Sequence, residues 1–485
     1  MELSILTSGT RRHILKGVAR NAAAPERVLH RLMRTTWGAT DIASRRQRVT
    51  LQLATALLET GNSEVAVALG RNRHLLAPIR WQLATHPDAE VRKAAVRRFA
   101  LPVPQPGCEI PTTLLTHLAD DTDPHVRSEV AAHDDTPDDV RTRLASDPDT
   151  DVRIAVAKWW TRPAPDVHRA LLTDPEAGVR KAACSPWHPV PPADLHPALL
   201  ADPTTRSLVA PHVRVTAERA MDLARDPDED VRAAVAGNPG LPQAVCDELS
   251  REHSALVRFS LLVSRHTRDE TRTRLYEEVV ASAEEDDEWF IAEGLLSTAW
   301  MGHHLRWLRQ AAVEEQLTLL DSPFPFLRYS LAACAGDLPQ DTVERLLKDA
   351  DPYVQKIAAL YADSPPTTEL VRIVWEHGDH LKISPGILGR PDFPAEAYER
   401  FATSQKPQLR AAAAAAPLST DSLETLAGDN EPWVRAAAAG NPKLPLHCLP
   451  SLLADGQRNV AEEAGTSARL PVEWMEAVLT AEGIE

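Results

Sequence analysis

Three groups of histidine, cysteine and acidic side chains are candidates for binding a metal ion. Cys184, His188 and His196 lie in one Pro-rich stretch, two histidines are adjacent at 303–304, and the sequence EHGDH occupies 376–380. The first group matches no zinc spacing, and the second has no third ligand nearby. A glycine inside the third group favours a polar turn. We therefore predict no metal ion and no other cofactor.

A second set of residues combines opposite charges at a fixed spacing. An aspartate stands six residues before an arginine at several places along the chain. If a turn separates the two residues, their side chains come close, and in a stack of such units each arginine can also reach the aspartate of the next unit. The result would be a structural ladder of charge-assisted hydrogen bonds. Alternatively, the arginines could bind phosphate, but a paired arginine has little charge left for a ligand. The pairs are Asp121/Arg127, Asp147/Arg153, Asp174/Arg180, Asp226/Arg232 and Asp429/Arg435.

The N-terminal region carries an excess of positive charge. Residues 1–100 contain 17 Lys/Arg and 7 Asp/Glu, a net charge of +10, whereas the remainder has a net charge of −26. This asymmetry could steer an anionic partner to the N-terminal end, favour head-to-tail self-association, or belong to a solvated surface without a partner. The net charge of −16 disfavours nucleic acid as a general partner. The candidate anion-binding patch consists of Arg11, Arg12, Lys16, Arg20, Arg27, Arg31 and Arg34.

Aromatic side chains recur at one position relative to the arginines. Trp160, Trp187 and Phe99 each stand seven residues after an arginine that follows valine, and Trp159 precedes Trp160. Exposed tryptophans often dominate the energy of protein interfaces. The two indoles could form a ridge that binds a partner, or they could pack over the turns between helices. Both interpretations remain open, and we keep these four residues as candidate partner-binding positions.

The segment DPDEDVRAAVAGNPGLPQAVCDEL, residues 226–249, shows which elements position these side chains. Asp226-Pro227 ends the preceding helix, because proline disfavours the helical conformation of the residue before it. Val231, Ala234 and Val235 then form one apolar stripe of a short helix. Asn-Pro-Gly ends that helix, and a second helix follows. Helices this short are only marginally stable in isolation, so they need neighbouring helices to pack against.

Imperfect copies of this segment recur along most of the chain. Successive Val-Arg pairs, or the residues in the same phase, stand 25–27 residues apart where the pattern is regular. A unit that cannot cover its own apolar face becomes stable in a stack, so the sequence predicts an all-α solenoid of two-helix repeats.

The pattern L-A-x-D-P-x-x-x-V-R-x-A-V-A-x-N-P resembles the leucine-rich repeat variant family and, more broadly, HEAT-like repeats. The resemblance covers roughly residues 10–470. It implies stacked helix pairs in a right-handed superhelix. Some members of that family hold an iron–sulfur centre through an N-terminal cysteine cluster, but this chain has no cysteine before Cys108. That cofactor is therefore not expected.

The domain organisation follows from interruptions of the repeat. A Pro-rich connector and an irregular acidic stretch separate regular arrays. The predicted parts are a basic cap with the first repeats (1–100), the connector (101–111), a regular array (112–268), enlarged or inserted repeats (269–320), a C-terminal array (321–470) and a C-terminal cap (471–485).

No catalytic motif stands out, so we expect a non-enzymatic scaffold that binds a protein or peptide on the concave face of the solenoid. The alternative is a nucleic-acid-binding or DNA-repair protein of the glycosylase-like HEAT type, for which Trp160, Asp166 and Trp187 are weakly suggestive. A third possibility, by fold analogy alone, is an accessory protein of cofactor attachment. With neither a secretory signal nor a long apolar run, we expect a cytoplasmic protein without membrane contact, and arginine-rich, alanine-rich usage suggests a bacterial source. Its oligomeric state stays open.

Overall fold

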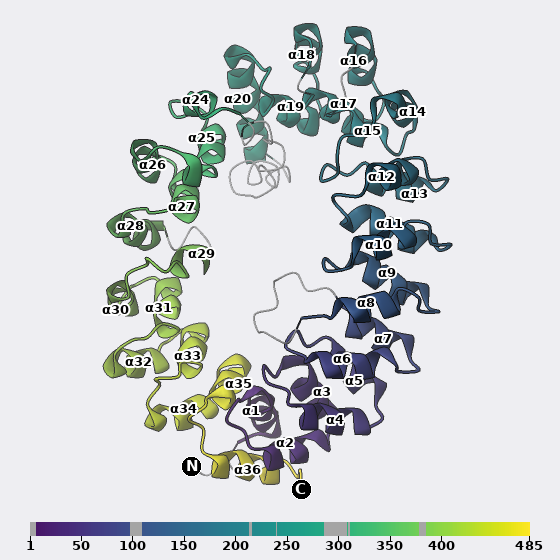
Figure 1. Ribbon diagram of the computed structural model, residues 1–485. Helices are drawn as coiled ribbons and strands as arrows, with labels where there is room; N and C mark the ends of the chain where they lie inside the picture. Colours follow the sequence, from purple (N-terminus) through teal and green to yellow (C-terminus); the bar gives the residue numbers. More distant parts are fainter. Residues whose placement is uncertain are drawn as a thin grey trace. The chain divides into compact units, whose positions relative to one another are not determined.

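The protein is built from short helices arranged in pairs (Figure 1). The computed structural model describes residues 6–97, 109–212, 216–238, 240–285, 308, 311–377 and 385–485. All regular elements within these ranges are helices, and none is a strand. The prediction of an all-α repeat array is therefore confirmed, while the handedness of a superhelix stays a prediction. The second half of the 269–320 region, with its acidic run at 284–288, lies largely outside the described residues, as do 303–304 and 378–380.

The chain divides into two compact units. Unit 1 combines Met1–Trp160 with Pro394–Glu485, and unit 2 spans Thr161–Phe393. In both units, the helix in the phase of the Val-Arg pair is here named the A helix, and the helix that follows it the B helix.

The A helices of unit 1 are α1 (Ser8–Arg20), α3 (Thr36–Arg45), α5 (Ser63–Gly70), α7 (Ala89–Ala95), α9 (Pro124–Ala132), α11 (Thr150–Trp159), α31 (Pro407–Ala414), α33 (Pro432–Ala439) and α35 (Arg458–Thr466). Its B helices are α2 (Glu26–Met33), α4 (Leu51–Glu59), α6 (Ala77–Ala84), α8 (Thr112–Leu118), α10 (Asp138–Leu144), α30 (Glu396–Ala402), α32 (Thr420–Ala427), α34 (Leu449–Leu453) and α36 (Val472–Ala481).

The A helices of unit 2 are α13 (Ala177–Ala183), α15 (Arg206–Val209), α17 (Glu229–Ala236), α19 (Ala255–Leu262), α25 (Pro325–Ala332), α27 (Pro352–Tyr361) and α29 (Pro385–Leu388). Its B helices are α12 (Pro165–Leu172), α14 (His196–Ala201), α16 (Ala217–Ala224), α18 (Gln243–Leu249), α20 (Asp269–Glu285), α24 (Val313–Leu317), α26 (Gln340–Leu347) and α28 (Thr367–His377). Among the described residues there are also three short 3₁₀ helices: η2 (Ala193–Leu195), η3 (Ala335–Asp337) and η4 (Leu446–Cys448).

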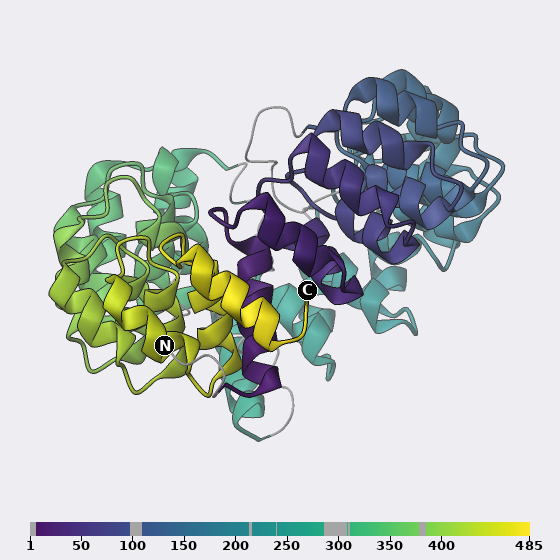
Figure 2. The same cartoon turned by 90° about the horizontal axis from the view of Figure 1, so that it is seen from below.

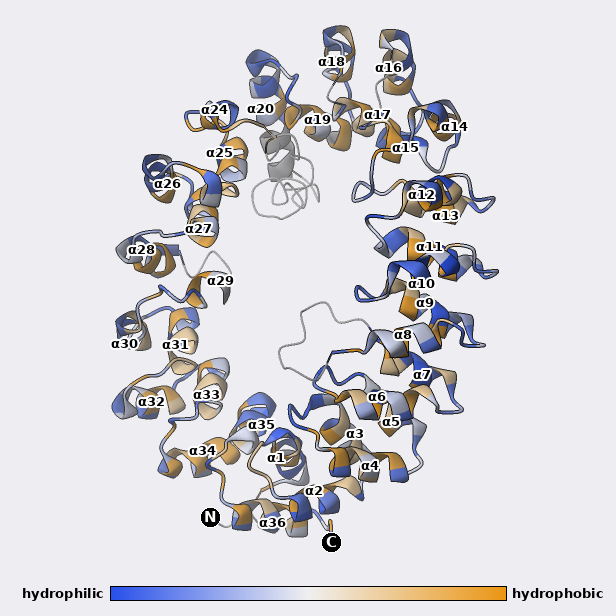
Figure 3. Ribbon diagram, in the orientation of Figure 1, coloured by the Kyte–Doolittle hydropathy of each residue, from blue (hydrophilic) through white to orange (hydrophobic). Residues whose placement is uncertain are grey.

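Local sequence explains where these helices begin. Several A helices follow an aspartate whose side chain accepts a backbone N–H of the first turn, as Asp123 does from His125 at 2.8 Å. Several B helices follow a proline, such as Pro242 before α18. The valine of the Val-Arg pair then points into the core, and Val126, Val152 and Val231 are fully buried. Figure 3 shows apolar and polar residues side by side on most helices, as expected of short amphipathic helices packed in pairs.

Each repeat packs mainly on its neighbours in the sequence. Successive A helices, such as α9 and α11 or α17 and α19, share larger contacts than successive B helices. The repeats therefore curve locally toward the A helices. This sequential packing is the property that defines a helical solenoid.

A buried asparagine joins consecutive repeats at the end of the A helix. The Asn441 side-chain amide donates to the carbonyls of Ala414 and Ala416 in the preceding repeat, at 2.7 and 2.8 Å. Its Oδ1 accepts the backbone N–H of Lys443 at 2.9 Å. Asn72 forms the equivalent bonds to Ala43 and Arg46. The asparagine of the repeat pattern thus links consecutive repeats and also forms part of its own turn.

Replacing Asn441 with alanine is expected to lower the free energy of unfolding by about 1–3 kcal/mol, because buried carbonyls of the preceding helix lose their donor. Asn430→Ala is the control, since that side chain is exposed and the change should cost less than about 0.5 kcal/mol. Urea denaturation of both variants measures the difference. Equal effects at the two positions would contradict a linking role for the buried amide.

Buried arginines support the C-terminal ends of A helices. Arg80 on α6 is fully buried and donates to the carbonyl of Ala95, the last residue of α7, at 3.0 Å. Arg272 on α20 donates to Leu262 and Ser264 at the end of α19, at 3.1 and 2.9 Å. Burial lowers the pKa of Arg272 below its usual value. A cation at a helix C-terminus is favourable because that end carries the negative pole of the helix dipole.

Candidate functional site

The arginine ladder joins consecutive repeats within each compact unit. Arg127 binds Asp147 of the following repeat through two parallel bonds, Nε to Oδ2 at 2.8 Å and Nη2 to Oδ1 at 2.9 Å. The third donor, Nη1, reaches the main-chain carbonyl of Asp121 in its own repeat at 2.8 Å. The aspartate six residues before the arginine therefore contributes its carbonyl to that arginine, and its carboxylate to the arginine of the preceding repeat.

The same arrangement recurs in both units. The carboxylate of Asp121 accepts two bonds from Arg92, at 2.7 and 2.9 Å, and Arg153 donates to the main-chain carbonyl of Asp147 at 2.9 Å. Further side-chain pairs are Arg180–Asp202, Arg206–Asp226, Arg232–Glu252, Arg328–Asp349, Arg410–Asp429 and Arg435–Asp455. Arg180 also donates to the carbonyl of Asp174. These bonds occupy the guanidinium groups, which favours a structural role over phosphate binding.

The ladder shifts the ionisation of its carboxylates. Burial raises the pKa of Asp147, but hydrogen bonds from Arg127 and from the Asp149 backbone N–H outweigh it, so the pKa lies below its ordinary value. The hydrogen bond from Arg410 lowers the pKa of Asp429. The pKa values of Asp121, Asp202, Asp349 and Asp455 are also lowered, because hydrogen bonds again exceed the opposing effect of burial.

We expect the free energy of unfolding to fall steeply in acid. An unfolded aspartate has a pKa of about 3.9, and the folded ladder carboxylates titrate lower. Their stabilisation is complete above the unfolded pKa and is lost as the pH falls through the folded pKa values. Urea denaturation between about pH 3 and pH 7 would measure this loss. In Asp121→Asn, the acid-dependent loss should be smaller than in the wild type, and an unchanged dependence would contradict the assignment.

The candidate tryptophans occupy different environments. Trp160 is 5% exposed, and the Arg141 guanidinium lies 6.0 Å from its ring centroid. The interpretation of Trp160 as part of an exposed ridge is therefore wrong, because the indole is buried. Trp159, at the end of α11, is 37% exposed and stacks with Lys158 at 5.0 Å. Phe99 lies outside the described residues.

Trp187 is half exposed on a turn that the surrounding residues hold in place. The turn joins α13 to η2 and contains four prolines between residues 185 and 192. The neighbouring His188 points inward and stacks on His168, with ring centroids 5.7 Å apart. Burial lowers the pKa of His168. His196 meets the Pro191 carbonyl at 2.7 Å.

Two apolar side chains of this turn face solvent. Trp187 is 50% exposed and Val190 57% exposed. Two exposed apolar side chains three residues apart mark this turn as a candidate contact surface, here named the Trp187 turn. Asp166, in the first turn of α12, belongs to the same compact unit.

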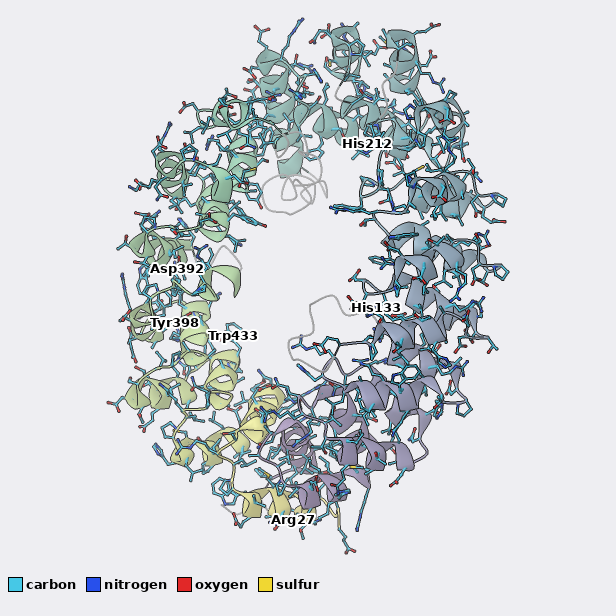
Figure 4. The ribbon with its side chains drawn as sticks, in the orientation of Figure 1. Arg27, His133, His212, Asp392, Tyr398 and Trp433 are labelled. Carbon is cyan, nitrogen blue, oxygen red and sulfur yellow. The ribbon has the colours of Figure 1, made fainter. Side chains whose placement is uncertain are left out.

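Sequence reasoning missed another exposed aromatic. Trp433, in the first turn of α33, is 50% exposed (Figure 4). It stands immediately before the valine of its Val-Arg pair, a position that Leu256, Phe326 and Tyr353 occupy in other copies. The repeat pattern alone therefore gave no signal that this side chain would be exposed.

The basic N-terminal residues contact the C-terminal segment. Five of the seven candidate residues do so, and the remaining two are Arg12 and Lys16. Arg12 lies over the ring of Trp37, 5.1 Å from its centroid. The contacts are Arg11–Glu482 at 3.0 Å, Arg20–Glu462 at 3.0 Å, Arg27–Glu476 at 2.6 Å, Arg31 to Thr480 Oγ1 at 3.1 Å, and Arg34 to the carbonyl of Glu485. Binding of an anionic partner to this patch stays a prediction, and it would compete with these contacts.

The described cysteines are buried, namely Cys184, Cys246, Cys334 and Cys448. Burial raises the pKa of Cys184 to about 12, and it also raises the pKa values of Cys246 and Cys448. Within the described ranges, no three His, Cys, Asp or Glu side chains are grouped so that they could hold a metal ion.

Comparison with known proteins returned structural likenesses only. No family model matches the chain, and no curated protein matches it. A solved leucine-rich repeat variant protein, the family that the sequence pattern resembles, is 23% identical and covers 46% of this chain and 84% of its own, with a TM-score of 0.33.

Two longer proteins align with nearly the whole chain. The UNC-45 chaperone, described as binding and folding muscle myosin, is 13% identical and aligns over 93% of this chain and 58% of its own, with a TM-score of 0.22. Kap121p bound to RanGTP is 13% identical and aligns over 97% and 50%, with a TM-score of 0.21. The chain thus spans about half the length of these two proteins. At such TM-scores the likenesses add nothing to what the packing of the helices establishes. None of the described helices has the length and apolar character needed to cross a membrane. The chain is a helical repeat protein of stacked helix pairs.

Proposed function

We propose that the protein is a non-enzymatic scaffold that binds a protein or peptide partner, and that the Trp187 turn is part of the contact surface. The exposure of Trp187 and Val190 on an ordered turn carries this proposal. A large indole on a fixed backbone offers contact area at little entropic cost, which is typical of residues that dominate interfaces. The pairing of the ladder arginines supports a binding mode led by apolar contact.

The proposed scaffold function is tested by affinity purification of the full chain at physiological salt, followed by binding measurements with the partner recovered. Trp187→Ala should weaken binding by roughly thirtyfold or more, the effect of losing an interface residue worth at least 2 kcal/mol. Trp433→Ala is a matched control, since Trp433 is equally exposed at 50% but lies on α33 in unit 1.

The possible outcomes distinguish the scaffold function from its assignment to the Trp187 turn. Loss of binding in Trp187→Ala alone supports both parts of the proposal. Loss in Trp433→Ala alone would keep the scaffold function and overturn the assignment to the Trp187 turn. If no protein or peptide binds the wild-type chain, the scaffold function itself is wrong.

A further inference from the structure

The first repeat of the chain packs on the last repeat. Helix α1 lies against α35 and α36, and α2 lies against α36, all within unit 1. Figure 2 shows the C-terminal helices, in yellow, beside the N-terminal helices, in dark purple. These are the contacts that a repeat makes with its successor elsewhere in the array: A helix on A helix, B helix on the next A helix, and B helix on B helix.

The buried asparagine link is also present at this junction. The Asn21 side-chain amide donates to the carbonyls of Gly465 and Ser467, at 3.1 and 2.7 Å. Its Oδ1 accepts the backbone N–H of Ala23 at 2.8 Å. Asn441 makes the same three bonds to its preceding repeat and its own turn. The first repeat therefore stands in the place of the repeat that would follow α36.

Two glycines allow the helices of the junction to approach closely. A Cβ atom built on Gly17 of α1 would lie 2.1 Å from the carbonyl oxygen of Glu462. A Cβ atom built on Gly465 of α35 would lie 2.4 Å from the carbonyl oxygen of Ile14. The two backbones thus contact each other directly across the junction. A residue with a Cβ atom at either position would collide with the facing helix.

Opposite charges line the two sides of the junction. Arg11, Arg20 and Arg27 project from the first repeat, and each meets a glutamate of the last repeat within 3.0 Å. Figure 4 labels Arg27 where α2 meets α36. Glu462 also accepts from Arg45 at 3.3 Å. The positive N-terminal and negative C-terminal surfaces are thus complementary to each other.

We propose that this junction is exchangeable, so that the last repeat of one copy accepts the first repeat of a second copy in the same geometry. The junction is non-covalent, and the surface of the first repeat is complementary to the surface of the last repeat. Within one chain the ends are tethered, and their high effective concentration favours the closed monomer. When the intramolecular junction is weakened, two copies can pair reciprocally and rebuild both junctions, as in domain swapping.

Charge reversal on opposite sides of the junction tests the exchange. The first variant carries Arg11→Glu, Arg20→Glu and Arg27→Glu, and the second carries Glu462→Arg, Glu476→Arg and Glu482→Arg. Each chain alone places like charges across its own junction. In a reciprocal pair of the two variants, both junctions again join opposite charges. A chain carrying all six substitutions restores the match within one molecule and is the folding control.

The two variants are mixed in equal amounts at high salt, which weakens ion pairs, and returned to physiological salt. Light scattering after size-exclusion chromatography measures the mass. We expect the mixture to contain more than roughly tenfold as much dimer as either variant alone, because like charges across a junction disfavour pairing. The wild type and the six-substitution chain should be monomers.

Two results would overturn the proposal. One is a mixture that stays monomeric while the six-substitution chain is folded and monomeric. The other is dimer at the same level in the mixture and in each variant alone, which would show pairing that does not use this junction. Neither result depends on partner binding at the Trp187 turn, so the scaffold function is tested separately.

Discussion

Replacing Asp121 with alanine is expected to lower the free energy of unfolding by about 3–5 kcal/mol, whereas the same change at the adjacent Asp120 should cost less than about 1 kcal/mol. The Asp121 side chain is 6% exposed and receives both bonds of Arg92, whose own side chain is 14% exposed. Removal of the carboxylate leaves that guanidinium buried without its counter-charge. It also removes the acceptor for the Asp123 backbone N–H.

Asp120 is a control from the same turn. It pairs with Arg143 at 3.3 Å, but the two side chains are 67% and 52% exposed, so water screens the interaction. Urea denaturation compares the two variants, and hydrogen exchange at the amides of α7 and α9 shows whether the loss is local. A similar loss in both variants would mean that burial of the ladder does not determine its contribution.

Replacing Gly17 with alanine is expected to destabilise the protein by about 1–3 kcal/mol, because the added methyl group collides with the backbone of α35. The same substitution at Gly9, in the same helix, should stabilise it by about 0.5–1 kcal/mol, because alanine is the better helix former. A methyl group at Gly9 would meet only Thr7 Oγ1, at 3.8 Å. The two variants therefore differ in packing against α35 and not in helix propensity.

Thermal and urea denaturation measure both glycine variants. Hydrogen exchange shows where the protein is destabilised, since Gly17→Ala should increase amide exchange in α1 and α35 and leave exchange in distant repeats unchanged. Stabilisation by both substitutions would show that α1 and α35 do not approach each other closely in solution, and the junction between the ends of the chain would then be wrong.

The repeat architecture could be predicted because its information is local. The Val-Arg phase, the prolines and the Asn-Pro turns each specify a helix or its end within a few residues, and a step of about 26 residues leaves little choice but a stack. The ladder could be predicted in part. The spacing of Asp121 and Arg127 placed them in one turn, but only the packing between repeats shows that the Arg127 side chain takes the carboxylate of Asp147.

Other features depend on contacts that a linear pattern does not contain. Trp160 and Trp187 share one position relative to their arginines, yet the first is buried and the second exposed, because different neighbours cover them. The pairing of Arg20 with Glu462 joins residues more than four hundred positions apart. The sequence held two signals for this pairing. One is the charge asymmetry between the ends of the chain, and the other is Asn21, which stands at the end of a helix as Asn441 does.

The buried cysteines make the chain well suited to site-specific labelling. Maleimides and iodoacetamide attack through the thiolate, so thiols that hold their protons at neutral pH and lie away from solvent react slowly. With Cys108 replaced by serine, a new cysteine at an exposed position such as 433 would carry a fluorophore over a low background. Energy transfer between two such dyes could then report distances between chosen repeats in an otherwise native chain.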